Sequence, residues 1–280
     1  MPSTSIDDLR DPRGRFSMLA IDQRGSLRTM LAQGEDPGRV SDEQLVAFKV
    51  EVARSLSGHA SAMLVDRDYG HEAALAAGCP VILAADVLSS SVPGGPVDSA
   101  ELDLEVTADV AREYRAAALK QLVPWTPETR DAAVDLSARF MELCRAAGLP
   151  GIVEGVVRPA DIADWSDADR DEAIVTAARD LGGVAPDLYK GEVPSYGRGD
   201  LAGITAVAAR VTAVLDCPWV VLSSGVTADD FPAAVQACEA GGADGFLAGR
   251  AIWADAVTAA DPADFLRTVS AARLRRMAAG

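Results

Sequence analysis

The chain has 280 residues and 49% hydrophobic side chains, enough for a well-packed core and close to the length of one (β/α)8 barrel, about 250 residues. Its net charge is −16, and its one short basic run is Arg273, Arg275 and Arg276, which argues against nucleic-acid binding. No apolar run reaches the roughly 18 residues of a membrane span, and the polar first residues do not resemble a signal peptide, so we expect a cytoplasmic protein with no membrane partner.

The apolar runs that suit buried parallel strands recur along the whole chain. In chain order, we predict strands at Met18–Asp22, Ser61–Asp66, Val81–Asp86, Ala118–Val123, Gly151–Val156, Asp187–Lys190, Trp219–Ser223 and Gly245–Ala248. Ala-rich segments with helical spacing lie between them, at Asp42–Leu56, Ala132–Ala147, Asp169–Leu181, Leu201–Leu215 and Phe231–Ala240. Ser41 with Gln44 resembles a capping box, and Gly148 and Gly241 are typical helix ends.

This alternation of strand and helix predicts the fold class. Eight strands, each followed by a helix or helical turn, favour a single closed (β/α)8 barrel that forms one domain over residues 1–280. A doubly wound open sheet is the other possibility. It would require a glycine-rich phosphate turn after the first strand, and Asp22-Gln23-Arg24-Gly25 is not such a turn.

Charged and polar residues gather where the predicted strands end, which is where barrel enzymes place their catalytic groups. The ends carry Asp22, Gln23, Arg24, Asp66, Asp86, Lys120, Glu154, Arg158 and Lys190. Asp66 and Asp86 could instead each cap a following helix. Together the residues predict one polar pocket that holds the substrate.

Small residues follow the last two predicted strands. They are Ser223, Ser224 and Gly225 after one strand, and Gly249 with Arg250 after the other. Such residues let backbone amides approach a phosphate, and Arg250 would add a countercharge. Two ordinary tight turns would have the same appearance. The pattern indicates an anion site and does not indicate a reaction.

Lysine is rare, because the chain has 23 arginines but only Lys49, Lys120 and Lys190. A lysine amine can lose its proton and attack a carbonyl, whereas arginine stays protonated. Lys120 and Lys190 lie in apolar runs where an idle ammonium group is costly. On neighbouring strands they would converge with Glu154, which could move protons or simply form a salt bridge. The pattern favours an enzyme that uses a carbonyl-reactive lysine.

No other chemistry is indicated as strongly. Only two histidines are present, His59 and His71, so a zinc-dependent mechanism has little support and we expect no cofactor. The four cysteines have no Cys-x-x-Cys spacing and are expected to be free thiols of a reducing compartment; they are Cys79, Cys144, Cys217 and Cys238.

The chain resembles the class I aldolases of the tagatose-1,6-bisphosphate aldolase and sulfofructosephosphate aldolase group. The stretches that carry the resemblance are Phe16–Arg24, Phe48–Val50, Val156–Pro159, Asp187–Lys190, Pro218–Val226 and Gly245–Trp253. The resemblance implies a (β/α)8 barrel in which Lys190 is the Schiff-base lysine, Lys120 its partner and Glu154 the acid/base carboxylate. It also implies an anion site at Ser224, Gly249 and Arg250.

The implied reaction cleaves a ketose 1-phosphate into dihydroxyacetone phosphate and an aldehyde. The sequences of the last two stretches are similar to those of the aldolases that cleave 6-deoxy-6-sulfofructose 1-phosphate, whose aldehyde product is sulfolactaldehyde. Tagatose or fructose 1,6-bisphosphate is the other candidate substrate. Gly191 and the loop Val87–Pro96 depart from the group and are expected to affect specificity.

Two other functions fit part of the pattern. A phosphosugar sensor would keep the pocket without turnover, and a phosphosugar isomerase would need a carboxylate base but no reactive lysine. Ala-rich outer helices suit a homo-oligomer as well as ordinary barrel packing.

Overall fold

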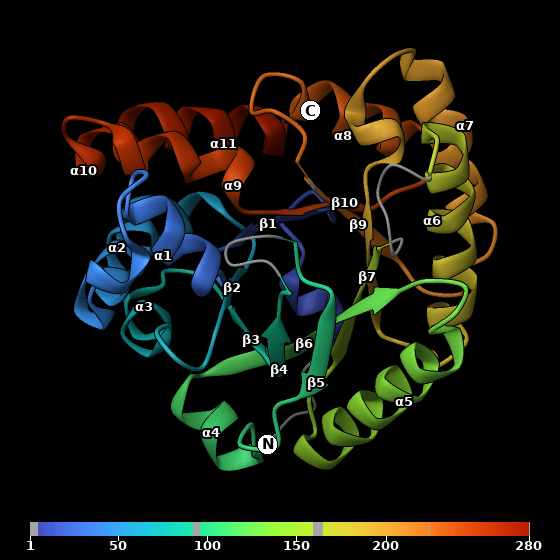
Figure 1. Cartoon of the computed structure of the whole chain (residues 1–280), viewed down its shortest axis with the longest axis horizontal. Helices are drawn as coiled ribbons and strands as arrows, with labels where there is room; N and C mark the ends of the chain where they lie inside the picture. Colours follow the sequence, from blue (N-terminus) through green and yellow to red (C-terminus); the bar gives the residue numbers. More distant parts are fainter. Residues whose placement is uncertain (1–4, 92–95, 159–164, 224, 280) are drawn as a thin grey trace.

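The computed structural model of the chain describes residues 5–91, 96–158, 165–223 and 225–279. Eight parallel strands close into a barrel in the order β1-β10-β9-β8-β7-β6-β3-β2, and helices surround them (Figure 1). The strands are β1 (Phe16–Ala20), β2 (Met63–Val65), β3 (Val81–Ala84), β6 (Ala116–Trp125), β7 (Gly151–Val157), β8 (Leu188–Glu192), β9 (Trp219–Leu222) and β10 (Gly245–Ala248). The predicted (β/α)8 barrel is confirmed.

The barrel has an apolar interior, because alternate residues of each strand point inward. The inner cluster is made by Phe16, Met18, Ala20, Ala62, Leu64, Ile82, Ala84, Ala118, Ile152, Leu188, Val220 and Leu247, together with Leu9. Leu9 comes from the short helix η1 (Ile6–Leu9), which precedes β1 and contacts β6. The strand residues between them face outward and form a second, larger cluster with the helices.

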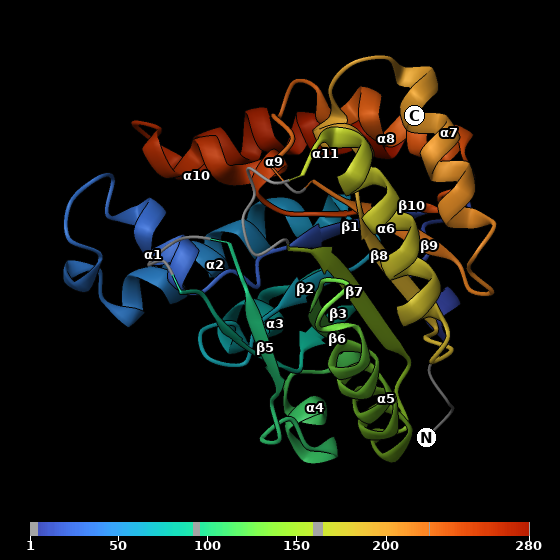
Figure 2. The same cartoon turned by 45° about the vertical axis from the view of Figure 1, so that its right-hand side comes forward.

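The outer layer consists of helices that run back between the strands. They are α1 (Gly25–Leu31), α2 (Asp42–Leu56), α3 (His71–Ala76), α4 (Ala108–Glu113), α5 (Arg130–Ala147), α6 (Asp167–Gly182), α7 (Leu201–Thr212), α8 (Phe231–Ala240), α9 (Arg250–Trp253), α10 (Pro262–Phe265) and α11 (Ala271–Ala279). Figure 2 shows α5, α6 and α7 along one side of the barrel, and α6 contacts both of its neighbours. In the described part of the chain, no helix is both long and apolar enough to cross a membrane.

The five predicted helices are present. Both predicted ends of α2 and α8 agree with the observed ones, and the ends of α5, α6 and α7 agree to within three residues. Ser41 and Gln44 form the predicted capping box at the start of α2, a motif that contributes about 1 kcal/mol. Gly148 ends α5 in the left-handed conformation that glycine adopts most easily, with φ at 69°. Sequence patterns therefore sufficed for the barrel strands and for these five helices, and did not predict the shorter helices of the outer layer.

The segment after β3 differs from the expected strand-to-helix connection. The stretch Val87–Pro96, expected to be a loop, contributes to an antiparallel hairpin of β4 (Asp86–Ser89) and β5 (Ser99–Leu102). In its register Val87 pairs with Glu101 and Leu88 with Ala100. These strands are short and half exposed, so they lack the continuous apolar run by which the barrel strands were predicted. Asp86 therefore begins a strand, so the alternative in which it caps a following helix is wrong.

Candidate active site

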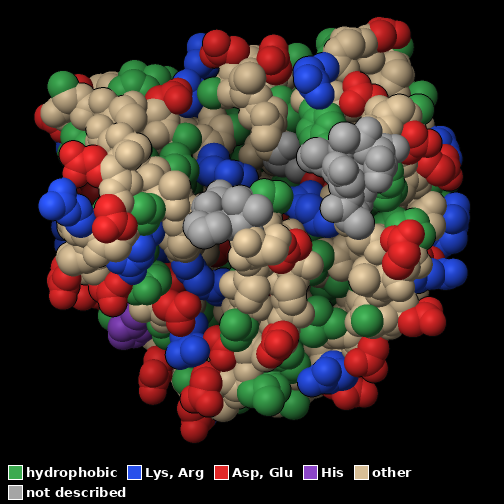
Figure 3. Space-filling model, viewed as in Figure 1, with side chains coloured by type: hydrophobic (Ala, Val, Ile, Leu, Met, Phe, Trp, Pro, Cys, Tyr) green, Lys and Arg blue, Asp and Glu red, His purple; other side chains and the backbone are tan. Residues whose placement is uncertain are grey.

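The alternation that fills the barrel interior also brings charged groups together at its carboxyl end. On or just beyond six strands, the residue two positions after an inward-facing apolar residue is charged. These charged residues are Asp22, Asp66, Asp86, Lys120, Glu154 and Lys190. All six are buried, with Asp22 the most exposed at 8%. In the space-filling view, basic side chains are visible near the middle of this face of the molecule (Figure 3).

Lys120 lies at the centre of this cluster, fully buried and surrounded by carboxylates. Its Nζ is 3.0 Å from Oδ2 of Asp22, 3.0 Å from Oδ2 of Asp86 and 2.7 Å from Oε2 of Glu154. Burial by itself would lower the pKa of Lys120, but the three carboxylates outweigh burial and raise that pKa well above its ordinary value. Lys120 is therefore a permanent positive charge.

Glu154 bridges the two lysines. Its Oε1 lies 3.0 Å from Nζ of Lys190, while its Oε2 faces Lys120. Glu154 and Lys190 are register partners on the adjacent strands β7 and β8, and each is only 4% exposed. The predicted convergence of Lys120, Glu154 and Lys190 is therefore present in the fold. A carboxylate between two amines can accept a proton from one while the other keeps it oriented.

Asp86 and Arg24 extend the cluster toward β1. Asp86 divides its oxygens between two cations, since Oδ1 accepts from Arg24 at 3.0 Å and Oδ2 contacts Lys120. The Leu122 N–H also donates to Oδ2 at 3.0 Å. Burial lowers the pKa of Arg24 and the charges of Asp86, Asp66 and Asp22 raise it, with a net rise. Arg24, predicted to bind substrate, is thus held by carboxylates of the cluster.

Asp22 belongs to the same network. Burial favours its neutral form, but the nearby charges of Lys120, Lys190 and Arg24 prevail and hold the pKa of Asp22 well below its ordinary value. Gln23, the next residue, is partly buried, and its Oε1 has no hydrogen-bond partner among the described residues. Both lie where the sequence predicted a substrate pocket.

The third lysine also lies in this region. Lys49 projects from α2, is fully buried, and donates to the carbonyls of Ile21 and Gln23 and to the carboxylate of Asp66. Burial lowers the pKa of Lys49, and the charge of Asp66 opposes that effect. Lys49 was not among the predicted site residues, although the scarcity of lysine applied equally to it.

Glu192 was also missed, although it points inward two residues after Lys190. It is 1% exposed and lies 3.2 Å from both Arg158 and Arg170, and its Oε2 accepts from the Val157 N–H at 2.7 Å. Arg158, a predicted substrate ligand, also donates to the carbonyl of Val97 beside the hairpin at 3.2 Å. The two-residue spacing after Lys190 could have predicted that Glu192 points inward. Its partner Arg170 could not be predicted in this way, because Arg170 lies on another element, α6.

Comparison with known proteins agrees with this geometry. Residues 16–255 match the DeoC/LacD family aldolase. The chain belongs to this family. It is therefore an aldolase of class I, a carbon–carbon lyase, as the lysine pattern predicted.

Individual relatives match this aldolase over most of both chains. The chain is 28% identical over 281 residues to a tagatose 1,6-diphosphate aldolase of Listeria monocytogenes, and this match covers 90% of the chain and 81% of the relative. It is 29% identical over 283 residues to one of Staphylococcus epidermidis, covering 91% and 85%. A solved Schiff-base-forming fructose-1,6-bisphosphate aldolase has the same fold, with a TM-score of 0.64, 17% identity and coverage of 94% and 95%.

The predicted anion residues of the aldolase lie after β9 and β10. Ser223 is buried and Gly225 is exposed beyond the end of β9, while Gly249 is buried before the short helix α9, whose first residue, Arg250, is exposed. Ser224 lies outside the described residues. Gly249 has little room, because a Cβ there would lie 2.7 Å from the carbonyl oxygen of Ala20.

Gly191 does not line the pocket of the aldolase. It faces the helix layer, where a Cβ would lie 3.0 Å from Cε1 of Tyr189 and 3.9 Å from Cε3 of Trp219. The residue lies between Lys190 and Glu192, which both point inward, so its own substituent must point outward. An effect of Gly191 on specificity would therefore have to act through the Tyr189 ring.

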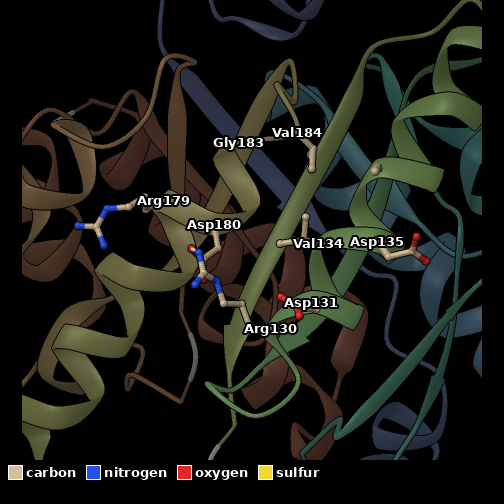
Figure 4. Close-up of a pocket in the computed structure, with 9 residues that line it drawn as sticks. Arg130, Asp131, Val134, Asp135, Arg179, Asp180, Gly183 and Val184 are labelled. Carbon is tan, nitrogen blue, oxygen red and sulfur yellow. Dashed lines mark ion pairs between the residues drawn. The ribbon is translucent and has the colours of Figure 1, made fainter.

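A groove lies on the outer wall of the aldolase. It is an open groove of about 800 Å³ between α5 and α6, and none of its lining residues belongs to a strand (Figure 4). Arg130 and Asp180 form an ion pair of 2.8 Å there, and Asp180 also accepts from Nε1 of Trp125 at 3.2 Å. The groove shares no residue with the charged cluster.

Proposed function

We propose that the protein cleaves a phosphorylated ketose through a Schiff base on Lys190. The observation that supports this assignment is the pairing of Lys190 with Glu154 at 3.0 Å, beside the ammonium of Lys120. An iminium mechanism requires a nucleophilic amine and a group that exchanges protons with it. The three side chains supply these elements at one point of the barrel.

The reaction begins when Glu154 accepts a proton from Lys190, leaving a neutral amine. The amine attacks the C2 carbonyl of the ketose, and one proton passes from the nitrogen to the C2 oxygen. Glu154 returns its own proton to that oxygen, which leaves as water, so the iminium forms and Glu154 is again a carboxylate. Glu154, or a water it orients, then removes the C4 hydroxyl proton. The C3–C4 bond breaks, its electrons form the enamine, and an aldehyde departs. Protonation at C3 and hydrolysis release dihydroxyacetone phosphate and restore Lys190.

Lys120 has a supporting electrostatic role in this scheme. Because Asp22 and Asp86 keep it charged, it holds the second oxygen of Glu154 throughout the cycle. The first oxygen therefore stays directed at Lys190. A fixed proton acceptor avoids the cost of reorientation during the reaction.

The phosphate of the ketose is assigned to the region after β9 and β10. Ser223, Gly225, Gly249 and Arg250 lie there, and Ser224 belongs to the same stretch of sequence. Arg24, Asp22 and Gln23 lie on the β1 side and are proposed to contact the sugar. Asp66 has protein partners at both carboxylate oxygens, and so contributes to this pocket by holding other groups.

The distal group of the substrate decides between two ketoses. The relatives described above are tagatose 1,6-diphosphate aldolases, which favours tagatose 1,6-bisphosphate or its fructose isomer. The amino-acid sequences of the stretches Pro218–Val226 and Gly245–Trp253 favour 6-deoxy-6-sulfofructose 1-phosphate. Measuring kcat/KM for aldol addition of dihydroxyacetone phosphate to glyceraldehyde 3-phosphate and to sulfolactaldehyde separates the two. The substrate assignment follows the aldehyde with the larger value.

Trapping tests the reactive lysine. Reduction with borohydride in the presence of dihydroxyacetone phosphate should leave a stable adduct on the peptide that contains Lys190, detectable by mass spectrometry. Lys190→Met should give a folded protein with neither adduct nor turnover, with wild type treated without ligand as the control. A folded wild-type protein without an adduct would instead support a sensor or an isomerase.

A further inference from the structure

Lys49 is a buried cation whose hydrogen-bonding capacity is used entirely within the protein. Its Nζ lies 2.7 Å from the carbonyl oxygen of Ile21 and 2.8 Å from that of Gln23, and it pairs with the carboxylate of Asp66. An ammonium has three donors, and these three acceptors use all of them. Lys49 therefore has no donor for substrate and can act only through the groups that it holds.

The two carbonyls flank a residue of the active site. β1 ends at Ala20, so residues 21–23 lie beyond the strand, and Ile21 N–H donates to the carbonyl of Leu64 at 2.9 Å. Lys49 fixes the peptide groups on both sides of Asp22. The carboxylate of Asp22 is in turn 3.0 Å from Nζ of Lys120.

Asp66 anchors the other side of Lys49. It is fully buried after β2, and its Oδ2 accepts from the Tyr69 N–H at 2.8 Å. The pair of Lys49 and Asp66 thus connects α2 with the ends of β1 and β2. A buried ion pair is a poor source of net stability compared with apolar packing, but it imposes a defined geometry.

We propose that Lys49 is a positioning residue, which fixes the main chain around Asp22 and so holds the Asp22 carboxylate against Lys120. This inference rests on the proposed Schiff-base reaction, because it gives Lys120 and Glu154 their importance. The charged groups that face Lys120 are Asp22 from the end of β1, Asp86 from β4 and Glu154 from β7. If Asp22 moves away, Lys120 is drawn toward the other two carboxylates, and the orientation of Glu154 toward Lys190 changes.

The test is a double variant, Lys49→Met with Asp66→Asn. Removing Lys49 alone would leave the Asp66 carboxylate buried and unpaired, which risks unfolding. Asparagine in place of Asp66 removes that charge and keeps an acceptor for the Tyr69 N–H. The matched control is Val52→Ala, a change at another fully buried position of α2 that does not contact residues 21–23 through a hydrogen bond.

Three quantities are measured on wild type, double variant and control: kcat, KM and the rate of borohydride-trapped adduct formation, with kcat followed across pH. We expect kcat and the trapping rate of the double variant to fall about 10- to 100-fold, with KM nearly unchanged and the pH profile displaced, because small misplacements of catalytic groups have effects of this size. The control should keep the wild-type pH profile even if it is less stable.

The outcomes separate the two hypotheses. A double variant that matches the control in kcat, trapping rate and pH profile would overturn the positioning role while leaving the Schiff-base assignment intact. Absence of an adduct in wild type would overturn the Schiff-base assignment itself. A double variant that does not fold is replaced by Lys49→Gln with Asp66→Asn, in which glutamine can still donate to one of the two carbonyls, and the same criteria apply.

Discussion

Replacing Lys120 with Met should destabilise the protein in a pH-dependent way. Of its three carboxylate partners, Asp86 keeps Arg24 at 3.0 Å and Glu154 keeps Lys190 at 3.0 Å. Asp22 has no other ion-pair partner in the described part of the chain. The variant therefore leaves the buried Asp22 carboxylate without its ion-pair partner and with only the charges of Lys190 and Arg24 nearby, which costs at most about 3–5 kcal/mol in the free energy of unfolding.

The sign of the pH dependence follows from the protonation of Asp22. In wild type its pKa is lowered by folding, so its contribution to stability is complete above the unfolded pKa of about 3.9 and is lost on acidification. Without Lys120, we expect burial to outweigh the remaining charges of Lys190 and Arg24 and to raise that pKa above the unfolded value, so the folded state binds the extra proton. Stability of the variant should then fall as pH rises, by at most about 1.4 kcal/mol per pH unit for one proton.

Urea unfolding at pH 5 and pH 8 measures this effect. Wild type should show no contribution from Asp22 to the difference between the two conditions, whereas Lys120→Met should lose more stability at pH 8. Lys190→Met is the matched control, since Glu154 still faces Lys120 at 2.7 Å and no carboxylate is left alone. An equal loss at both pH values for Lys120→Met would refute the argument that Asp22 becomes a buried charge without an ion-pair partner.

Three further predictions follow from the same geometry. Glu154→Gln should lower kcat about 10²- to 10⁴-fold, since an amide cannot accept the proton of the reactive amine. Steady-state kinetics measures this loss, and a near-normal kcat would contradict the acid/base role. Gly155→Ala should cost about 1–3 kcal/mol in thermal or urea unfolding, because a Cβ would lie 2.2 Å from Oη of Tyr189, and an unchanged midpoint would mean that the ring can move. Burial raises the pKa of Cys79 to about 12 and that of Cys217 to about 11, so both thiols should react slowly with a disulfide reagent at pH 8 until urea is added; fast labelling of the native protein would disprove this.

The sequence was informative where chemistry and periodicity coincide. Two-residue alternation beyond an apolar strand places Lys120, Glu154 and Lys190 inward at one end of the barrel, and lysine scarcity singles out two of them. The barrel itself followed from the repeated alternation of buried strands and helices. These signals are local, so a single sequence contains them.

Other features depend on contacts between distant segments. The role of Asp86 as a bridge between Arg24 and Lys120 depends on how three strand ends meet, and Arg170 reaches Glu192 from another element. The β4–β5 hairpin was missed because its strands are short and half exposed. Lys49 was detectable from composition, but its position in a helical segment gave no indication that it reaches the end of β1.

The burial of all three lysines has a consequence for the surface of the enzyme. Lys49 and Lys120 are 0% exposed and Lys190 is 4% exposed, so the folded exterior carries almost no lysine amine. Aldehydes condense with such amines, and an aldolase continually releases aldehydes into its own surroundings. Arginine supplies the positive charges of the exterior and remains protonated there. We therefore expect the folded protein to be modified slowly by aldehydes at lysine, since the lysine amines are buried and the one proposed to react with a carbonyl lies in the pocket.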